Sequence, residues 1–215
     1  MHHPYYPLTL DIPHYVANET PRFQLVASVL LVIGSIVASA FSLAKKNKRI
    51  LSSSEALRFT WFVLCACLHC GLEAYWITHR HRVPARSDFL AEVWKEYAHG
   101  DSRYVTADPL LIAIETLTVF IWGPLCIITA YCIWQSLPLQ YLYQLIASIA
   151  HLFSTSLYFV MDIPEGFKNC DPHPVYFWIY FVAFNAPWLV IPIVLLSQSI
   201  KRISQSLNET SKKVN

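Results

Sequence analysis

The chain has 215 residues, of which 55% are hydrophobic and only 14% are charged. These proportions exclude a disordered chain and argue against an ordinary soluble domain, in which roughly 25% of residues are charged. The formal net charge of +2 gives no reason to expect a nucleic acid as a partner.

Five apolar segments are long enough to cross a bilayer as helices, which requires roughly 20 mainly apolar residues. They cover residues 23–44, 59–78, 109–135, 139–161 and 174–200. Spanning strands would be about half as long and would alternate in polarity. The sequence therefore predicts an all-α membrane protein in which residues 23–200 form a bundle of five transmembrane helices.

The basic residues beside these segments predict how the bundle is oriented in the membrane. Lys45, Lys46, Lys48 and Arg49 follow the first segment without a nearby acid, which places this connection in the cytoplasm. Residues 1–22 are then lumenal and lack the basic start of a cleaved signal peptide, and residues 201–215 form a basic cytoplasmic tail. The last four residues, KKVN, resemble a dilysine retrieval signal and predict the endoplasmic reticulum membrane; a solvated basic tail is the alternative.

A shorter helix is expected in the connection between the second and third segments. Apolar residues recur there at helical spacing: Phe89, Leu90, Val93, Trp94 and Tyr97. Ser87 or Asp88 can cap the start of this helix, and Gly100 can end it. We interpret it as an amphipathic lumenal helix that lies near the membrane surface. Its aromatic face is either an anchor, which is the simpler interpretation, or a lid over a cavity.

Ionisable side chains within the apolar segments are the most informative residues, because they are costly at bilayer depth and are functional by default. His69 and Glu73 lie four residues apart in the second segment, so they share one helix face. In the third segment, Glu115 shares a face with Thr118 and Trp122. The alternative for these residues is a structural hydrogen bond between helices.

Further polar and aromatic side chains lie in the last two segments. Asn185 and Trp188 are three residues apart in the fifth segment. Asn185 can orient a carboxyl group, as Thr118 can, and Trp188 can present a ring face to a cation. His151 in the fourth segment is expected to form a hydrogen bond between helices. Spacing alone leaves open whether these side chains face one cavity.

The polar residue types of these segments suit the addition and removal of protons on an apolar substrate. The chain has neither a phosphate-binding loop nor a dinucleotide motif, so we expect no cofactor. Cys67 and Cys70 have the spacing of a zinc half-site, but no second thiol pair accompanies them. We therefore interpret the cysteines as packing residues and expect no metal.

Residues 91–104, AEVWKEYAHGDSRY, closely resemble the WKEYxKGDSRY signature of the emopamil-binding protein family of 3β-hydroxysteroid Δ8,Δ7-isomerases, which share the EXPERA domain. His69 and Glu73 are similar to the HxxxE motif of that family. ETLT at 115–118 with WGP at 122–124 resembles its next helix, and YFWIYF at 176–181 with Asn185 and Trp188 resembles its last helix. The resemblance covers nearly the whole chain.

The resemblance implies a five-helix enzyme of the endoplasmic reticulum membrane that moves a sterol double bond from C8=C9 to C7=C8 without a cofactor. In the implied reaction the alkene is protonated at C9, a cation forms at C8, and a proton leaves C7. Besides the sterol, the implied partners are membrane lipid, inhibitory cationic amphiphilic amines and a second copy of the chain in a homodimer.

Carried over to the matching positions, the resemblance also implies a set of site residues. The catalytic residues would be His69, Glu73, Glu115, Thr118, Asn185 and Trp188, and the substrate-binding residues would be Trp94, Tyr97, Asp101, Arg103, Tyr104 and Trp122. The His69/Glu73 pair and Glu115 would divide the acid and base roles. Thr118 and Asn185 would orient Glu115, and Trp188 would face the cation. Which carboxyl group protonates C9 is open.

Two other functions compete with this one. A non-catalytic binder of sterols or cationic amines would share the fold, but it would not need both carboxyl groups and His69. A small transporter would also use carboxyl groups within the membrane, but the chain shows no internal repeat. Transport also leaves the lumenal signature unexplained.

Overall fold

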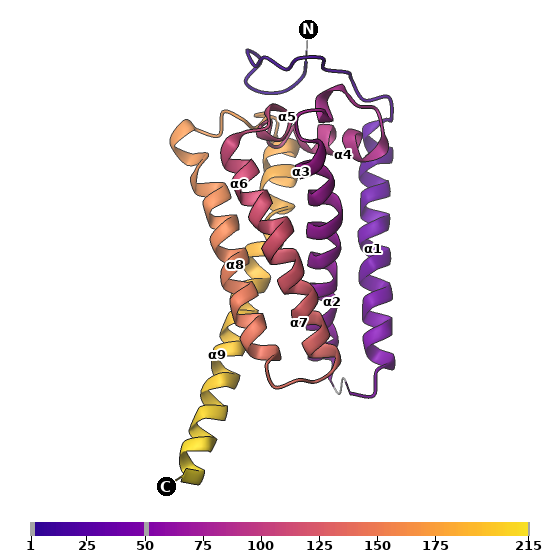
Figure 1. Ribbon diagram of the computed structural model, residues 1–215. Coiled ribbons are helices and arrows are strands. Elements are labelled where there is room, and N and C mark those ends of the chain that lie inside the picture. Colours follow the sequence, from indigo (N-terminus) through magenta and orange to yellow (C-terminus); the bar gives the residue numbers. More distant parts are fainter. Residues whose placement is uncertain (1–2, 50–51, 215) are drawn as a thin grey trace.

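The computed structural model describes residues 3–49 and 52–214, and every regular element in this part of the chain is a helix. Five helical stretches are long and apolar enough to cross a membrane (Figure 1). They are Arg22–Lys46, Ser53–His79, Pro109–Trp134, Gln140–Glu165 and Val175–Lys212. The five predicted segments are thus confirmed as helices. The last helix continues well beyond residue 200, and Asn215, the end of the dilysine-like tail, lies outside the described residues.

The long stretches pack side by side as a bundle (Figure 1). Their α-helices are α1 (Arg22–Lys46), α2 (Ser53–Cys67), α3 (Ala74–His79), α6 (Pro109–Leu117), α7 (Gly123–Trp134), α8 (Gln140–Val160) and α9 (Pro187–Val214). α2 packs against both α1 and α7, and α9 packs along α8. α2 begins with a capping box, in which Ser52 and Glu55 each accept a hydrogen bond from the backbone N–H of the other.

Three of the long stretches contain π-helical turns, which the sequence analysis did not predict. These turns are η1 (Leu68–Glu73) between α2 and α3, η3 (Thr118–Trp122) between α6 and α7, and η5 (Val175–Ala183) before α9. π-Helical turns inside α-helices occur frequently at functional sites. η1 contains His69 and Glu73, and η3 contains Thr118 and Trp122. Four predicted site residues therefore lie on π-helical turns.

Short elements and the N-terminal segment close one end of the bundle (Figure 1). The short elements include η2 (Val83–Ala85), α4 (Phe89–Tyr97), α5 (Arg103–Thr106) and, after α8, η4 (Ile163–Glu165). α4 confirms that a helix forms in the second connection, and Asp88 is its N-cap. Tyr5 and Ile12 of the N-terminal segment are buried in the same core cluster as Trp76 and Trp94.

The polar face of α4 is covered, because its charged side chains Glu92, Lys95 and Glu96 are buried. The Glu92 carboxylate accepts hydrogen bonds from the backbone N–H groups of Glu19 and Thr20, at 2.6 and 3.3 Å. The Lys95 ammonium is fully buried and donates to the Val16 carbonyl at 2.8 Å. The N-terminal segment therefore covers α4 and supplies the polar partners that a surface helix would find in water.

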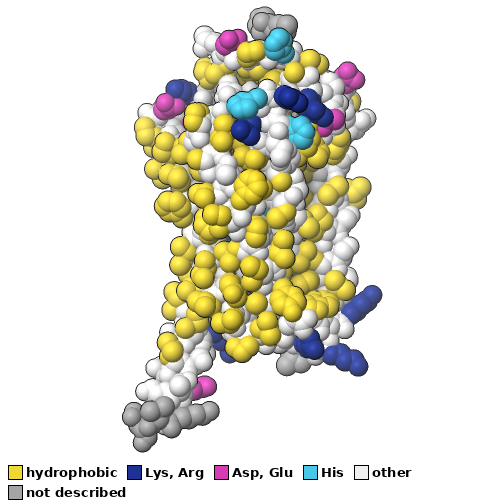
Figure 2. Space-filling view, viewed as in Figure 1, with side chains coloured by type: hydrophobic (Ala, Val, Ile, Leu, Met, Phe, Trp, Pro, Cys, Tyr) yellow, Lys and Arg dark blue, Asp and Glu magenta, His cyan; other side chains and the backbone are white. Residues whose placement is uncertain are grey.

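The outer surface of the bundle is apolar along its middle. Figure 2 shows hydrophobic side chains over the central part of the visible face, and charged side chains gathered toward its two ends. Exposed apolar residues occur on several long helices, for example Leu31, Ile127, Phe153 and Val194. Soluble monomeric proteins rarely expose large contiguous apolar patches. This distribution is the one expected of a membrane protein.

Gly123 lies where the start of α7 passes close to η1. A Cβ atom added there would lie 2.6 Å from the Cys70 sulfur and 3.2 Å from the Cβ of His69. We expect Gly123→Val to lower the free energy of unfolding by about 1–3 kcal/mol through overpacking and to displace His69. Gly34→Val is the matched control, because a Cβ at Gly34 meets no atom within 4 Å. Unfolding in detergent compares the two variants, and equal losses would contradict this account of Gly123.

Candidate active site

A cavity of about 400 Å³ lies within the bundle, next to α4 and α5. Its size falls in the range of small-molecule sites. Side chains from α1, η1, α6, η3, α8 and the start of α9 line it. The residues predicted to be catalytic all contribute to the lining: His69, Glu73, Glu115, Thr118, Asn185 and Trp188. The structure thus brings together side chains whose convergence the sequence left open.

His69 joins a carboxyl group on its own helix to a second imidazole on another helix. Nδ1 of His69 is 2.7 Å from Oε2 of Glu73, and Nε2 of His69 is 3.2 Å from Nε2 of His151 on α8. Both imidazoles are only 3% exposed. When a neutral His69 donates its Nδ1–H to Glu73, its Nε2 accepts from His151. The interhelical hydrogen bond predicted for His151 is confirmed, and its partner is a site residue.

Glu115 on α6 is held by a tyrosine. The Tyr104 hydroxyl on α5 donates to Oε1 of Glu115 at 2.7 Å. Burial raises the pKa of Tyr104 well above its ordinary value, so this hydroxyl stays a donor near neutral pH. Glu115 and Glu73 both line the cavity, so the two carboxyl groups face the same space.

Thr118 and Asn185 form hydrogen bonds with groups other than Glu115. The Thr118 hydroxyl donates to the Ile114 carbonyl at 2.9 Å, because a threonine within a helix readily bonds back to its own backbone. Asn185 donates to the Tyr97 hydroxyl at 2.9 Å and to the Phe181 carbonyl at 2.7 Å. Asn185 therefore positions Tyr97 instead of a carboxyl group.

Aromatic rings close the cavity on the side of α4 and α5. The Trp94 and Tyr104 rings stack with their centroids 4.8 Å apart, and Tyr97 meets Tyr104 edge-on at 5.3 Å. The Trp94 indole donates to the Leu72 carbonyl at 3.1 Å. These three aromatic residues and Trp122 line the cavity, as was predicted for substrate-binding residues. The aromatic face of α4 is thus a lid, the alternative to the anchor.

Asp101 and Arg103 differ from the prediction, since neither lines the cavity. Both are buried, and Nη2 of Arg103 is 2.7 Å from Oδ2 of Asp101. The Arg103 guanidinium also lies over the ring of Tyr158, 5.1 Å from its centroid. Buried charges are stable only when they are paired, so these two residues bind each other instead of facing an apolar space. They support the cavity wall through Tyr158, which lines it.

The comparison with protein families shows to which family the chain belongs. Residues 89–199 match the model of the family described as EXPERA (EXPanded EBP superfamily). The chain belongs to the EXPERA family. The matched region carries the lid helix α4, Glu115, Asn185 and Trp188. The resemblance found in the sequence is therefore confirmed.

Individual relatives extend the likeness of this EXPERA chain over nearly its whole length. A Cavia porcellus protein named 3-beta-hydroxysteroid-Delta(8),Delta(7)-isomerase is 33% identical over 99% of the chain and 93% of its own length. An Oryza sativa subsp. japonica protein named as a probable isomerase of the same type is 28% identical, over 94% and 92%. A Melia azedarach protein named isomeliandiol synthase is 32% identical, over 67% and 68%.

One wall of the EXPERA cavity was missed by the sequence analysis. His151, Ser154, Thr155 and Tyr158 of α8 all line the cavity. Trp122 on η3 donates its indole N–H to the Ser154 hydroxyl at 3.2 Å, which ties this wall to the third helical stretch. The spacing of the four α8 residues, i, i+3, i+4 and i+7, defines one helix face. That periodicity is the signal that could have found them.

Trp188 supplies an aromatic face to the EXPERA cavity. Its ring packs at a tilt on Trp61, with centroids 5.4 Å apart, and both residues line the cavity. The cavity therefore combines three carboxyl groups, from Glu73, Glu96 and Glu115, with two imidazoles and several indoles in apolar surroundings. Such a set can give and take protons on an apolar ligand, and an indole can stabilise a positive charge on that ligand.

Proposed function

We propose that the chain is a sterol isomerase that moves a ring double bond from C8=C9 to C7=C8. The observation that carries this proposal is the convergence of Glu115 and the His69/Glu73 pair on one apolar cavity. The relatives named as 3-beta-hydroxysteroid-Delta(8),Delta(7)-isomerases support the choice of substrate. The shift adds one proton and removes another, so it needs no change of oxidation state.

The proposed reaction passes through a carbocation. An acid of the cavity donates a proton to C9, the positive charge forms at C8, and a base removes a proton from C7 as the new double bond forms. The His69/Glu73 pair and Glu115 divide these two roles. Glu73 and Glu115 both line this cavity, so the two carboxyl groups face the same bound sterol. The pair can therefore offer an acid and a base together.

Three side chains assist the reacting groups in this mechanism. Tyr104 is a positioning residue, because its hydroxyl fixes Glu115 by a 2.7 Å hydrogen bond. Asn185 acts in the same way on Tyr97, whose ring is part of the lid. Trp188 faces the C8 cation, where a desolvated ring face contributes about 2 kcal/mol or more.

We place this enzyme in the endoplasmic reticulum membrane as a bundle of five transmembrane helices. Residues 1–22 are lumenal, residues 23–200 form the transmembrane isomerase domain, and residues 201–215 form a cytoplasmic tail. Lys45 and Lys46 are exposed at the end of α1, at the same end of the bundle as the C-terminus (Figure 1). A basic end of this kind faces the cytoplasm, and the lid helix α4 then lies on the lumenal side.

Complementation of a yeast strain that lacks sterol C8 isomerase tests the proposed function. We expect the chain to restore Δ7 sterols, and we expect deuterium at C9 when the purified protein works in heavy water. Failure to form Δ7 sterol by a well-expressed protein would contradict the isomerase. If that protein still bound cationic amphiphilic amines, it would be the non-catalytic binder.

Trp188→Ala is expected to slow isomerisation and to weaken the binding of inhibitory cationic amines. Losing about 2 kcal/mol of cation–ring attraction corresponds to roughly 30-fold in each quantity. Initial rates and competition with a labelled amine measure the two effects. Trp178→Ala is the matched control, because this indole is 61% exposed on the outer surface. If amines bind the Trp188 variant as tightly as the wild type, Trp188 does not face the cation.

A further inference from the structure

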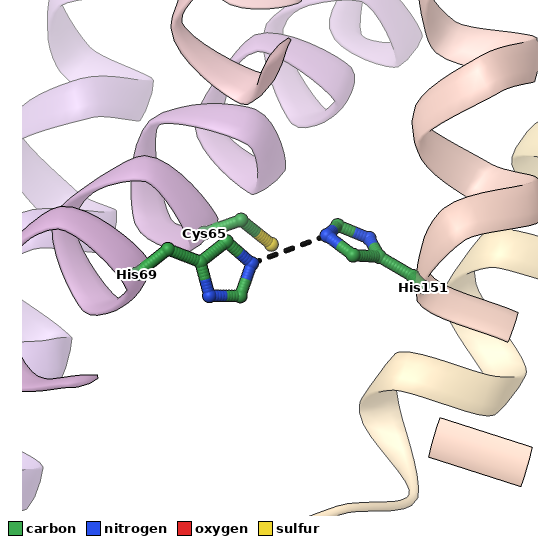
Figure 3. Close-up of side chains that lie close together, drawn as sticks. All are labelled: Cys65, His69 and His151. Carbon is green, nitrogen blue, oxygen red and sulfur yellow. Dashed lines mark hydrogen bonds between the residues drawn. The ribbon is translucent and has the colours of Figure 1, made fainter. Parts of the chain in front are cut away.

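A cluster of soft metal-ligating side chains adjoins the His69/Glu73 pair. The ligand atoms of Cys65, His69 and His151 all lie within 4.8 Å of one another. Figure 3 shows these side chains converging from the α2–η1 stretch and from α8. The Cys126 sulfur on α7 is 3.7 Å from Nε2 of His151 and adds a fourth donor. All four residues are buried, and the proposed reaction uses only His69.

Two distances in this cluster match those between the ligands of a tetrahedral zinc ion. Zn–N bonds of about 2.0–2.1 Å and Zn–S bonds of about 2.3 Å place two nitrogens roughly 3.3 Å apart, and a nitrogen and a sulfur roughly 3.6 Å apart. Nε2 of His69 and Nε2 of His151 are 3.2 Å apart, and the Cys126 sulfur is 3.7 Å from the latter. An ion can therefore replace the hydrogen bond between the imidazoles with little movement of either ring.

Glu73 orients the His69 ring so that its Nε2 can bind a metal ion. A histidine that binds a metal almost always directs its second ring nitrogen to a carboxylate, a carbonyl or a water. Nδ1 of His69 is 2.7 Å from the Glu73 carboxylate, which leaves the Nε2 lone pair for an ion.

The charges of the sulfur ligands favour a divalent metal ion such as Zn²⁺. Binding through sulfur releases the thiol protons of Cys65 and Cys126. The two resulting thiolates balance a divalent cation, so the ion and its four ligands carry no net charge of their own, which lowers the cost of a position among apolar helices. Thiolate and imidazole ligands in a tetrahedral arrangement are typical of Zn²⁺.

We propose that these four side chains form an inhibitory binding site for a soft divalent metal ion, Zn²⁺ in particular. The inhibitory part rests on the proposed function, because the metal takes the Nε2 lone pair of His69 and removes this imidazole from proton transfer. His69 and His151 both line the cavity. The ion can therefore reach the cluster from the space that the sterol occupies.

Cobalt binding tests the site independently of any activity. The purified full-length protein in detergent is titrated with Co²⁺, whose tetrahedral thiolate complexes absorb visible light, and Zn²⁺ is then added as a competitor. We expect the wild type to bind Co²⁺ with thiolate bands that Zn²⁺ abolishes. Removing a ligand should weaken binding at least about tenfold, in Cys65→Ser, Cys126→Ser and His151→Gln alike. Cys132→Ser is the matched control, because Cys132 is a buried thiol on the same helix as Cys126.

Isomerisation by the same preparations tests the inhibitory role. We expect Zn²⁺ to inhibit the wild type and a chelator to restore its activity. Cys65→Ser should keep the basal rate and need about tenfold more Zn²⁺ for the same inhibition. Cys65→Ser, Cys126→Ser and His151→Gln test the metal site separately. If one of them fails to fold, as judged by size-exclusion chromatography, the other two still test the site.

The outcomes separate the two proposals. A wild type without thiolate–cobalt bands, or folded variants that bind Co²⁺ as tightly as the control, would overturn the metal site. Metal binding without inhibition would overturn the inhibitory role alone. A wild type that binds Co²⁺ but isomerises no sterol before Zn²⁺ is added would count against the proposed function and leave the site standing.

Discussion

Glu115→Gln is expected to abolish isomerisation while sterol binding stays measurable. Glutamine keeps the shape of glutamate, and its carbonyl oxygen can accept the Tyr104 hydrogen bond that Glu115 receives at 2.7 Å. The amide cannot exchange a proton, however, so one of the two proton transfers is lost. Losing a positioned acid or base costs about 100- to 10,000-fold in rate. Initial rates with a Δ8 sterol and sterol binding in detergent measure the two effects separately.

The matched control for this substitution is Glu209→Gln, because Glu209 is exposed in the last part of α9. We expect it to turn over like the wild type. Normal turnover in Glu115→Gln would remove Glu115 from proton transfer. The His69/Glu73 pair would then have to carry both steps.

The long helices could be predicted because hydropathy alone decides them. An apolar run of about 20 residues in a bilayer must satisfy its backbone within the helix, so a segment such as 23–44 requires no tertiary information. The π-helical turns could not be predicted in this way, because η1 and η3 have apolar sequences like those of their neighbours. Their position depends on how the helices pack, as where Gly123 meets His69.

The predicted faces of the second and third helices were correct, since residues three or four apart stay neighbours in a helix. The hydrogen-bond partners of these side chains could not be predicted from the sequence. Tyr104 holds Glu115, and Tyr97 accepts from Asn185, because α4 and α5 fold over the cavity. Such contacts between separate elements have no periodic signal. The charges of α4 were also misleading, since buried partners for Lys95 come from the distant N-terminal segment.

The cysteines show both what spacing can find and what it cannot. Cys67 and Cys70 drew attention because they have zinc-like spacing, but both are exposed. Cys65 lies four residues before His69, so the rule that paired His69 with Glu73 also pairs it with Cys65. The remaining donors come from α7 and α8, and only the fold brings them to the same place.

Asp101→Ala is expected to lower the free energy of unfolding by about 3–5 kcal/mol. Asp101 is 0% exposed, and its two oxygens accept from Nε and Nη2 of Arg103 at 2.9 and 2.7 Å. Removing the carboxylate leaves a buried guanidinium without its counter-ion, which is far more costly than losing both charges together. Unfolding titrations in mixed detergents measure the change.

A double variant distinguishes the unpaired charge from simple loss of contact. Asp101→Ala with Arg103→Met leaves no buried ion at these two positions, so we expect it to be more stable than Asp101→Ala alone. The surface pair Lys168–Glu165, 2.9 Å apart and about half exposed, gives the control, in which Glu165→Ala should cost less than about 1 kcal/mol. If the double variant were as unstable as the single one, the instability would come from lost packing around Tyr158, whose ring Arg103 covers.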